Sequence, residues 1–344
     1  MSLENQNSNV ESRWPHRLAV VLVCATFPLI FIGGTVTTYK AGMAVADYPT
    51  TFGYNMFLYP WTTWIAGPWN IFVEHGHRMF AALVGLVTIG LVVVAWRMES
   101  RVWVRQLTYL ALALVCFQGG LGGARVLLNA VTLARWHACI APLFFALAVA
   151  IAAVMSRRWR STINPIVSAK SGSLQRLSVL TTVLAYCQIV AGAFVRHIPE
   201  GATADYFRIA VFFHLALAAA LAIHIPLVLW NAVRHHRAQP AVFRPAVGLA
   251  CLLVLQLALG AATYVMKYNW PPFMADFGFS SGMVVERNEF WSSLVTTAHV
   301  AVGSLILVTS LAMAIWSFRL YRPETLPGPG DSVANGSRWM GVAV

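Results

Sequence analysis

The sequence predicts an all-α polytopic membrane protein with eight transmembrane helices arranged as two pseudo-symmetric four-helix bundles. Of its 344 residues, 58% are hydrophobic and only 10% are charged, whereas a soluble globular protein has about 25% charged residues. Apolar runs of about 20 residues match the hydrocarbon core of a bilayer at 1.5 Å per helical residue. The halves of the chain also repeat one order of glycine-rich and histidine-containing runs, which predicts the two bundles.

Each transmembrane helix is predicted from its own apolar run. The first run has no charged residue and ends near a glycine pair, and the second begins beside a histidine and continues uncharged from residue 81 to residue 96. The third run ends near glycines and the fourth begins near a histidine, and the fifth to eighth runs repeat this order twice. The predicted spans are 18–39, 75–96, 106–126, 135–155, 174–196, 208–231, 243–266 and 293–317.

The basic residues predict the orientation of the spans. When the loops are assigned alternately to two sides, sixteen Lys and Arg residues fall on one side and eight on the other. Positive residues accumulate in cytoplasmic loops, so both termini are predicted to be cytoplasmic. The net charge of +12 then reflects topology and contact with membrane lipid, and we expect no nucleic-acid partner.

The predicted segments follow from these spans. They are a cytoplasmic N-terminal segment (1–17), an N-terminal bundle (18–160), a cytoplasmic linker (161–173), a C-terminal bundle (174–320) and a disordered cytoplasmic tail (321–344). Two longer outer loops, at about 41–73 and 268–292, are rich in Trp, Tyr, Pro and Phe. Such aromatic residues favour the membrane interface, and we expect both loops to lie as lids over the helix ends. The five cysteines lie in apolar runs and are expected to be buried small hydrophobes.

Small-residue patches recur in the outer half of every odd-numbered span, and in three of them a glutamine precedes the patch. One interpretation is close helix packing through small residues. The other is that the patches leave room for a flat macrocycle, and the two are compatible. The patches are Gly33-Gly34-Thr35, Gln118-Gly119-Gly120-Leu121-Gly122-Gly123, Gln188-Ile189-Val190-Ala191-Gly192-Ala193 and Gln256-Leu257-Ala258-Leu259-Gly260-Ala261-Ala262.

Four histidines, one near the start of each even-numbered span, give the strongest functional signal: His77, His137, His214 and His299. Because even-numbered spans start at the outer face, all four are predicted to lie there at similar depth. An ionisable group inside a span is costly and usually functional. Two imidazoles facing each other across a bundle are a standard arrangement for binding a haem iron. We therefore expect one iron-binding pair per half, and bare zinc or copper is disfavoured because clustered Cys or carboxylate ligands are missing.

Cations near the outer helix ends are candidate partners for haem propionates, with lipid headgroups as the alternative partner for each. This set comprises Lys40, Arg78, Arg125, Arg135, Arg196 and Arg208. Two further histidines are weaker candidates. His197 is expected to line the site or the interface, and His224, about 15 Å deeper than His214, is expected to be structural.

One carboxylate distinguishes the halves. Glu74 precedes His77 by three residues, so the two share a helix face, whereas Val211 precedes His214 by three. Glu74 is interpreted either as a proton donor or charge stabiliser at a reactive site or as a carboxylate favoured by the helix macrodipole. Arg78 is expected to bind either Glu74 or a propionate.

With these residues, the chain resembles the heme A synthase family over residues 13–322. The acid–histidine–arginine cluster together with three further ordered histidines is specific, whereas the single glycines are weak. Some bacterial members carry a cysteine pair in the first outer loop, and this sequence has none in residues 41–73, so no redox role of that pair transfers. The matching motifs are Gly33-Gly34-Thr35-Val36-Thr37, Ala41-Gly42-Met43-Ala44-Val45-Ala46-Asp47-Tyr48-Pro49, Glu74-His75-Gly76-His77-Arg78 and Gln118-Gly119-Gly120-Leu121-Gly122-Gly123.

The resemblance implies an oxidoreductase that converts the C8 methyl group of heme O to the formyl group of heme A through hydroxylation, for use by cytochrome oxidase. It implies that Glu74 is the catalytic acid and that the substrate porphyrin lies at His77 and His137. It further implies that His214 and His299 ligate a resident haem b. The expected partners are heme O, the heme O synthase and cytochrome oxidase assembly factors, and a homo-oligomer is compatible with the pattern.

Two other functions remain open from the residues. A non-enzymatic di-haem b electron carrier would saturate both irons and would have no use for Glu74. A transporter with inverted repeats is less typical of this pattern, because both halves start on the same side of the membrane and the repeats are therefore parallel.

Overall fold

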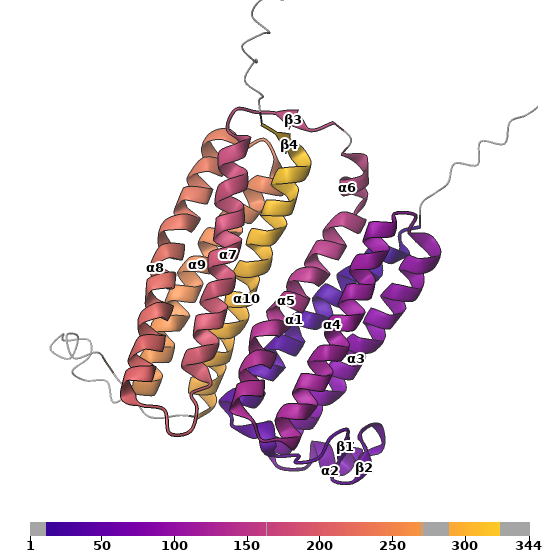
Figure 1. Cartoon of the computed structure of the whole chain (residues 1–344), viewed down its shortest axis with the longest axis vertical. Helices are drawn as coiled ribbons and strands as arrows, with labels where there is room; N and C mark the ends of the chain where they lie inside the picture. Colours follow the sequence, from indigo (N-terminus) through magenta and orange to yellow (C-terminus); the bar gives the residue numbers. More distant parts are fainter. Residues whose placement is uncertain (1–11, 163, 269, 271–288, 324–344) are drawn as a thin grey trace, which may run out of the picture.

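The protein is described by a computed structural model covering residues 12–162, 164–268, 270 and 289–323. Eight of its helices are long and apolar enough to cross a membrane, so the predicted all-α multi-pass class is confirmed (Figure 1). These helices are α1 (Trp14–Thr38), α3 (Trp69–Met98), α4 (Val102–Leu127), α5 (Val131–Met155), α7 (Ser171–Arg196), α8 (Ala204–His235), α9 (Pro240–Tyr268) and α10 (Glu289–Leu320).

The helices extend beyond the predicted apolar spans. Helix α3 begins six residues before its predicted start at residue 75, and α8 extends four residues past each end of the span 208–231. Hydropathy identifies only the apolar part of a helix, whereas capping groups decide where it ends. At α8 the side chain of Thr203 accepts a hydrogen bond from the Tyr206 N–H at 3.3 Å, which fixes a polar first turn outside the apolar run.

Four helices form a closed ring in each half of the chain. In the first ring α3 packs on α1 and α4, and α5 packs on α4 and α1. In the second ring α8 packs on α7 and α9, and α10 packs on α9 and α7. The same cyclic order in both rings supports the expected division into 18–160 and 174–320, which stays a prediction.

Helices α5 and α10 form the interior of the molecule. Half of the residues in their apolar windows are buried, against at most 28% in the other six spans. Helix α10 contacts α5 and α1 across the boundary between the bundles, where Phe145 of α5 joins the core that includes Ile306 and Leu307. In Figure 1 these helices lie between the outer members of the two bundles. The outer helices therefore present apolar side chains to lipid.

The first outer loop is folded and lies at the end of the molecule where α3 and α5 begin, which we call the histidine end (Figure 1). The second predicted lid, at 268–292, falls mostly outside the described residues. The first loop contains η1 (Ala41–Met43), an antiparallel hairpin of β1 (Thr50–Thr51) and β2 (Tyr54–Asn55), η2 (Met56–Leu58) and α2 (Trp61–Ile65).

The opposite end carries α6 (Arg157–Ser161) and a parallel pair of short strands, β3 (Ile166–Val167) and β4 (Tyr321–Arg322). The first residues of the expected tail 321–344 are thus ordered, because Tyr321 is buried against His236, with ring centroids 4.6 Å apart. Residues 324–344, like residues 1–11 of the N-terminal segment, lie outside the described residues.

The expectation that the cysteines are buried is wrong for four of the five. Only Cys139 is buried, and the others are exposed on the outer surface of the helices: Cys24, Cys116, Cys187 and Cys251. An apolar run in a membrane helix does not distinguish core-facing from lipid-facing positions, because lipid is as apolar as the core.

Candidate functional site

The structure brings the four predicted histidines together as two facing pairs, both at the histidine end. His77 of α3 faces His137 of α5 with ring centroids 6.5 Å apart. His214 of α8 faces His299 of α10 with ring centroids 6.2 Å apart. Each pair joins an outer helix to one of the two interior helices across its own bundle.

The spacing within each pair fits one metal ion between two imidazoles. A histidine nitrogen bonds a metal at about 2.0 Å and lies about 1.2 Å from its ring centre, so two rings on opposite sides of one ion have centroids about 6.4 Å apart. The observed separations are within 0.2 Å of that value. Bis-histidine ligation of a haem iron therefore needs no rearrangement of the helices, although ligation itself stays a prediction.

Each imidazole packs its Cε1 edge on a glycine of the preceding helix in its bundle. A side chain would overlap the imidazole at Gly33 and crowd it at Gly192 and Gly260, whereas at Gly122 it would only reach ordinary contact distance, so one glycine of each patch contacts an imidazole. A Cβ atom would lie from the histidine Cε1 at 2.9 Å for Gly33 and His77, 3.4 Å for Gly122 and His137, 3.2 Å for Gly192 and His214, and 3.1 Å for Gly260 and His299.

Buried polar atoms at the pairs are left without partners among the described residues. They include Nδ1 of all four histidines and the Oε1 atoms of Gln118, Gln188 and Gln256. In the second bundle, the amide nitrogens of Gln188 and Gln256 lie 3.3 Å and 3.5 Å from the Nε2 atoms of His214 and His299. In the first bundle Gln118 instead donates to the His137 carbonyl at 3.1 Å. Unsatisfied buried polar groups are costly, which favours a bound ligand at these sites.

Glu74 and Arg78 form a buried ion pair that also binds the first outer loop. Arg78 Nη2 donates to Glu74 Oε1 at 3.1 Å and to the Val45 carbonyl at 2.7 Å. Its Nη1 donates to the carbonyls of Asp47 at 2.7 Å and Thr50 at 3.1 Å. Glu74 Oε2 accepts a hydrogen bond from the Val45 N–H at 2.9 Å. Of the two expected partners of Arg78, the structure therefore shows Glu74.

Further contacts fix the same loop over the first pair. The Tyr48 ring packs on Gly123 of α4, where a Cβ would overlap it, and Arg125 donates to the Gly42 carbonyl. His75, which the sequence places on another face than His77, lies 3.1 Å from the Thr51 hydroxyl through its Nδ1. The loop is thus bound to two helices of the first bundle.

Within the loop, Asp47 closes the turn that carries the hairpin. Partial burial acts to raise the pKa of Asp47, but hydrogen bonds from the Gly53 and Phe52 N–H groups, at 2.9 and 2.8 Å, outweigh it and lower that pKa below its ordinary value. The carboxylate therefore stays ionised and keeps accepting both bonds at neutral pH.

Three of the predicted cations gather around His197 near the boundary between the bundles. Arg135 donates to the His197 carbonyl, and Arg196 donates to the Gly34 carbonyl of α1, both at 2.6 Å. Burial, followed by the positive charges of Arg196, Arg125 and Arg135, lowers the pKa of His197 to about 4. Arg208 is instead exposed and paired with Asp205 at 3.1 Å.

Sequence reasoning missed the role of Tyr48 and the link between the glutamines and the glycine contacts. The signal for the second was present, because Gln118, Gln188 and Gln256 each precede a histidine-contacting glycine by four residues. Positions four apart share a helix face. Tyr48 lies in a loop, where spacing carries no such information.

Two facing imidazole pairs inside eight apolar helices define a multi-pass membrane protein with two candidate haem sites. The chain belongs to the cytochrome oxidase assembly protein family, whose model matches residues 16–276 and so includes three of the four histidines. It is also similar to a heme A synthase of Symbiobacterium thermophilum, with 28% identity over 207 residues that cover 55% of this chain and 68% of the relative.

Proposed function

We propose that this protein is a heme A synthase, an oxidoreductase that converts the C8 methyl group of heme O to a formyl group through hydroxylation. Its family membership and its similarity to a named heme A synthase support this function. The observation that carries it is the asymmetry between two otherwise matched sites. Both imidazole pairs have the spacing for one iron, but among the described residues a buried acid–arginine ion pair lies on a histidine-bearing helix of the first bundle only.

The two pairs take different porphyrins in this proposal. His77 and His137 face the substrate, heme O, and His214 and His299 bind the iron of a resident haem b. Haem b, when bound, supplies a one-electron redox centre. The amides of Gln188 and Gln256 lie against the Nε2 atoms of the second pair and fix the orientation of the two rings.

Glu74 is the group proposed to handle a proton or to stabilise charge at the substrate. Its carboxylate accepts from Val45 N–H and Arg78, which fixes it on the face of α3 that it shares with His77. Each carboxylate oxygen accepts one of these hydrogen bonds and keeps a second lone pair for a proton. Glu74 therefore connects loop 41–51 to the face of α3 that carries His77.

The orientation and the partners complete the proposal. The histidine end lies at the outer face of the inner membrane, with both termini cytoplasmic. Arg125 and Arg196 are proposed to contact propionates, whereas both terminal nitrogens of Arg78 already bind the loop and Glu74. Heme O synthase and cytochrome oxidase assembly factors are the proposed protein partners.

Pigment analysis after co-expression with a heme O synthase tests the function. The wild-type chain should yield heme A and hydroxylated heme O, with haem b retained. Glu74→Ala should stop product formation while the haem b spectrum persists. A wild-type protein that binds two haems but makes neither product would instead be an electron carrier, and full activity of Glu74→Ala would refute the assigned role.

A further inference from the structure

Two apolar grooves occupy equivalent positions in the two bundles. One is lined by α1 and α3, with further walls from Trp64 of α2 and from Phe290, Ser293 and Leu294 of α10, and the other is lined by α7 and α8. The glycine–histidine contact of each bundle fixes this correspondence, and counting along the helices from these contacts matches the lining residues. The matched pairs, first bundle first, are Ile32 with Ala191, Thr35 with Phe194, Val73 with Ala210 and Gly76 with Phe213.

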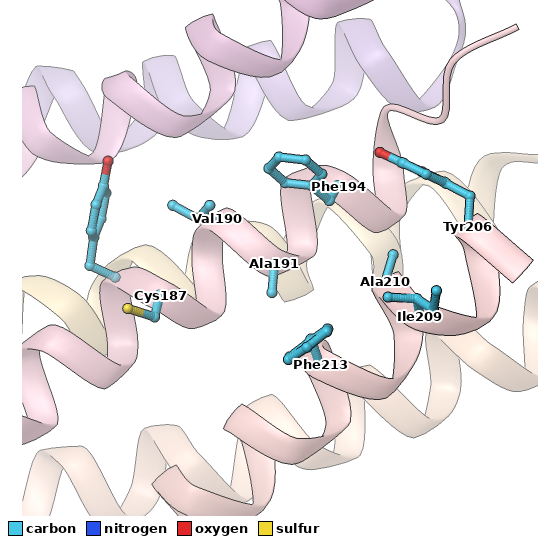
Figure 2. Close-up of a pocket in the computed structure, with 9 residues that line it drawn as sticks. Cys187, Val190, Ala191, Phe194, Tyr206, Ile209, Ala210 and Phe213 are labelled. Carbon is cyan, nitrogen blue, oxygen red and sulfur yellow. The ribbon is translucent and has the colours of Figure 1, made fainter. Parts of the chain in front are cut away.

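The grooves differ in size, and the two largest exchanges between them open the first groove, although Ile32 and Val73 are larger than Ala191 and Ala210. The first groove has a volume of about 660 Å³ and the second about 380 Å³. Figure 2 shows the second groove, whose lining includes the rings of Phe194 from α7 and Phe213 from α8. In the first groove, Thr35 and Gly76 stand at the positions of these two phenylalanines, and their smaller side chains leave more open space. Its volume lies within the range of about 300–1,000 Å³ typical of small-molecule sites.

An aromatic wall covers the first groove. Trp64 of α2 stacks on Phe72 with ring centroids 5.9 Å apart, and Trp69 stacks on the other side of this cluster at 5.5 Å. The indole N–H of Trp64 donates to the Phe72 carbonyl at 3.1 Å, which fixes the wall to α3. A Cβ atom at Gly76 would lie 3.6 Å from the Trp64 ring, so the wall stands directly over this glycine.

The first groove adjoins, along α1 and α3, the positions that carry the first glycine–imidazole contact, and it is almost wholly apolar. Gly76 directly precedes His77, and Ile32 directly precedes the glycine that contacts the same imidazole. Along α3 the lining runs from Trp69 to Leu83, about 21 Å at 1.5 Å per residue. A long flexible hydrocarbon chain attached to a porphyrin at His77 fits this shape better than a second polar ligand does.

We propose that this groove binds the isoprenoid chain of the substrate porphyrin, and that Thr35 and Gly76 are specificity-determining residues. The proposal rests on the proposed function, because heme O differs from haem b by such a chain in place of a vinyl group. The half that takes heme O needs space for the chain, and the half that binds haem b does not. The exchanges of Thr35 for Phe194 and of Gly76 for Phe213 agree with this difference.

Substitution of phenylalanine at the two matching positions of the first groove tests the proposal. Gly76→Phe and Thr35→Phe variants are co-expressed with a heme O synthase and purified, and heme O, heme A and haem b are extracted and quantified per protein. Each variant should lower the summed heme O and heme A content about tenfold, because the added ring overfills the groove. The haem b content should stay at the wild-type level, which also reports that the second bundle is folded.

Three further variants serve as controls for this test. Ile209→Phe adds similar bulk to the second groove and should leave the heme O content unchanged. Gly76→Ala introduces only an ordinary 3.6 Å contact and should bind heme O within about twofold of wild type, and Gly76→Leu serves if the Phe variant loses haem b.

Unchanged heme O content in a folded Gly76→Phe protein would overturn the proposal. Loss of co-purified phospholipid without loss of heme O would also overturn it, by assigning the groove to a lipid acyl chain. A wild-type protein that neither binds heme O nor makes heme A would contradict the proposed function itself, which is a separate outcome.

Discussion

The two bundles share one frame and differ in what surrounds it. Both have four helices in the same cyclic order, an imidazole pair with centroids 6.2–6.5 Å apart and a glycine under each imidazole. Within the part of the chain that the structure describes, only the first bundle adds a buried acid–arginine pair, and its first outer loop is bound to that pair. Only the second places a glutamine amide against both imidazoles. In the proposed function, iron ligation belongs to this shared frame and reactivity belongs to the additions.

The largest expected effect separates the two imidazole pairs. His214→Ala and His299→Ala should remove nearly all of the resident haem b, because each deletes one of its two iron ligands. His77→Ala should retain that haem and lose heme A formation. Reduced-minus-oxidised spectra of the purified variants measure the difference, and equal loss of haem b in all three variants would break the comparison.

Arg78→Leu gives the first bundle the residue that stands at the matching position, Leu215, of the second. The change leaves the buried Glu74 carboxylate unpaired and three loop carbonyls without a donor, which we expect to cost about 3 kcal/mol. The measurement is thermal unfolding of the purified protein, with limited proteolysis within residues 41–51 as a local readout. A wild-type proteolysis pattern would show that the loop does not depend on this pair.

The glycine contacts predict a graded effect. Gly33→Ala brings a Cβ to 2.9 Å from the His77 ring, so the imidazole must move, and affinity for heme O should fall by about tenfold, since overpacking costs 1–3 kcal/mol. Gly122→Ala meets His137 at 3.4 Å and should change the affinity by less than about twofold. Porphyrin titration measures both, and the reverse order would argue against the imidazole contact.

Gln188→Leu replaces the amide beside His214 with the residue found at the matching position, Leu29, in the first bundle. We expect haem b affinity to fall about tenfold, as for outer-shell partners of other metal-bound histidines. The rate of haem transfer to an apo-acceptor protein reports the change. An unaltered rate would mean that the amide does not orient the imidazole.

The smallest expected effect is that of Arg208→Ala, which removes an exposed ion pair with Asp205. The change in the free energy of unfolding should stay within about 0.5 kcal/mol, and heme A formation should match wild type. Thermal unfolding and pigment analysis check both points. A clear loss of haem would return Arg208 to the set of propionate contacts.

Much of the fold was predictable because lipid imposes long apolar helices with internally satisfied backbones. The pairing of His77 with His137 was also predictable, since helix direction places both near one end. The helix ends were not, because α3 begins at Trp69 in an aromatic segment that hydropathy does not separate from the loop. The outward-facing positions of Cys24 and Cys116 were not predicted, because lipid-facing and core-facing positions look alike in an apolar sequence.

The part of the site built by the first outer loop was beyond sequence reasoning. The contacts of Val45, Tyr48 and Thr50 with α3 and α4 depend on the path of a loop, which has no period from which a facing side chain can be read. The Glu74–Arg78 pair was within reach because both lie on one helix four residues apart. Sequence patterns therefore located the shared frame, and structure was needed for the additions that distinguish the bundles.

The burial of α5 and α10 has a consequence for communication between the sites. Each of these helices carries one histidine of a pair, His137 and His299, and the two helices pack directly on each other. An electron that passes from one pair to the other therefore has a route through the protein interior, away from the lipid-facing helices. Substitutions at the contact between α5 and α10 would then change the rate of electron exchange between haems bound at the two pairs, while each imidazole pair stays intact.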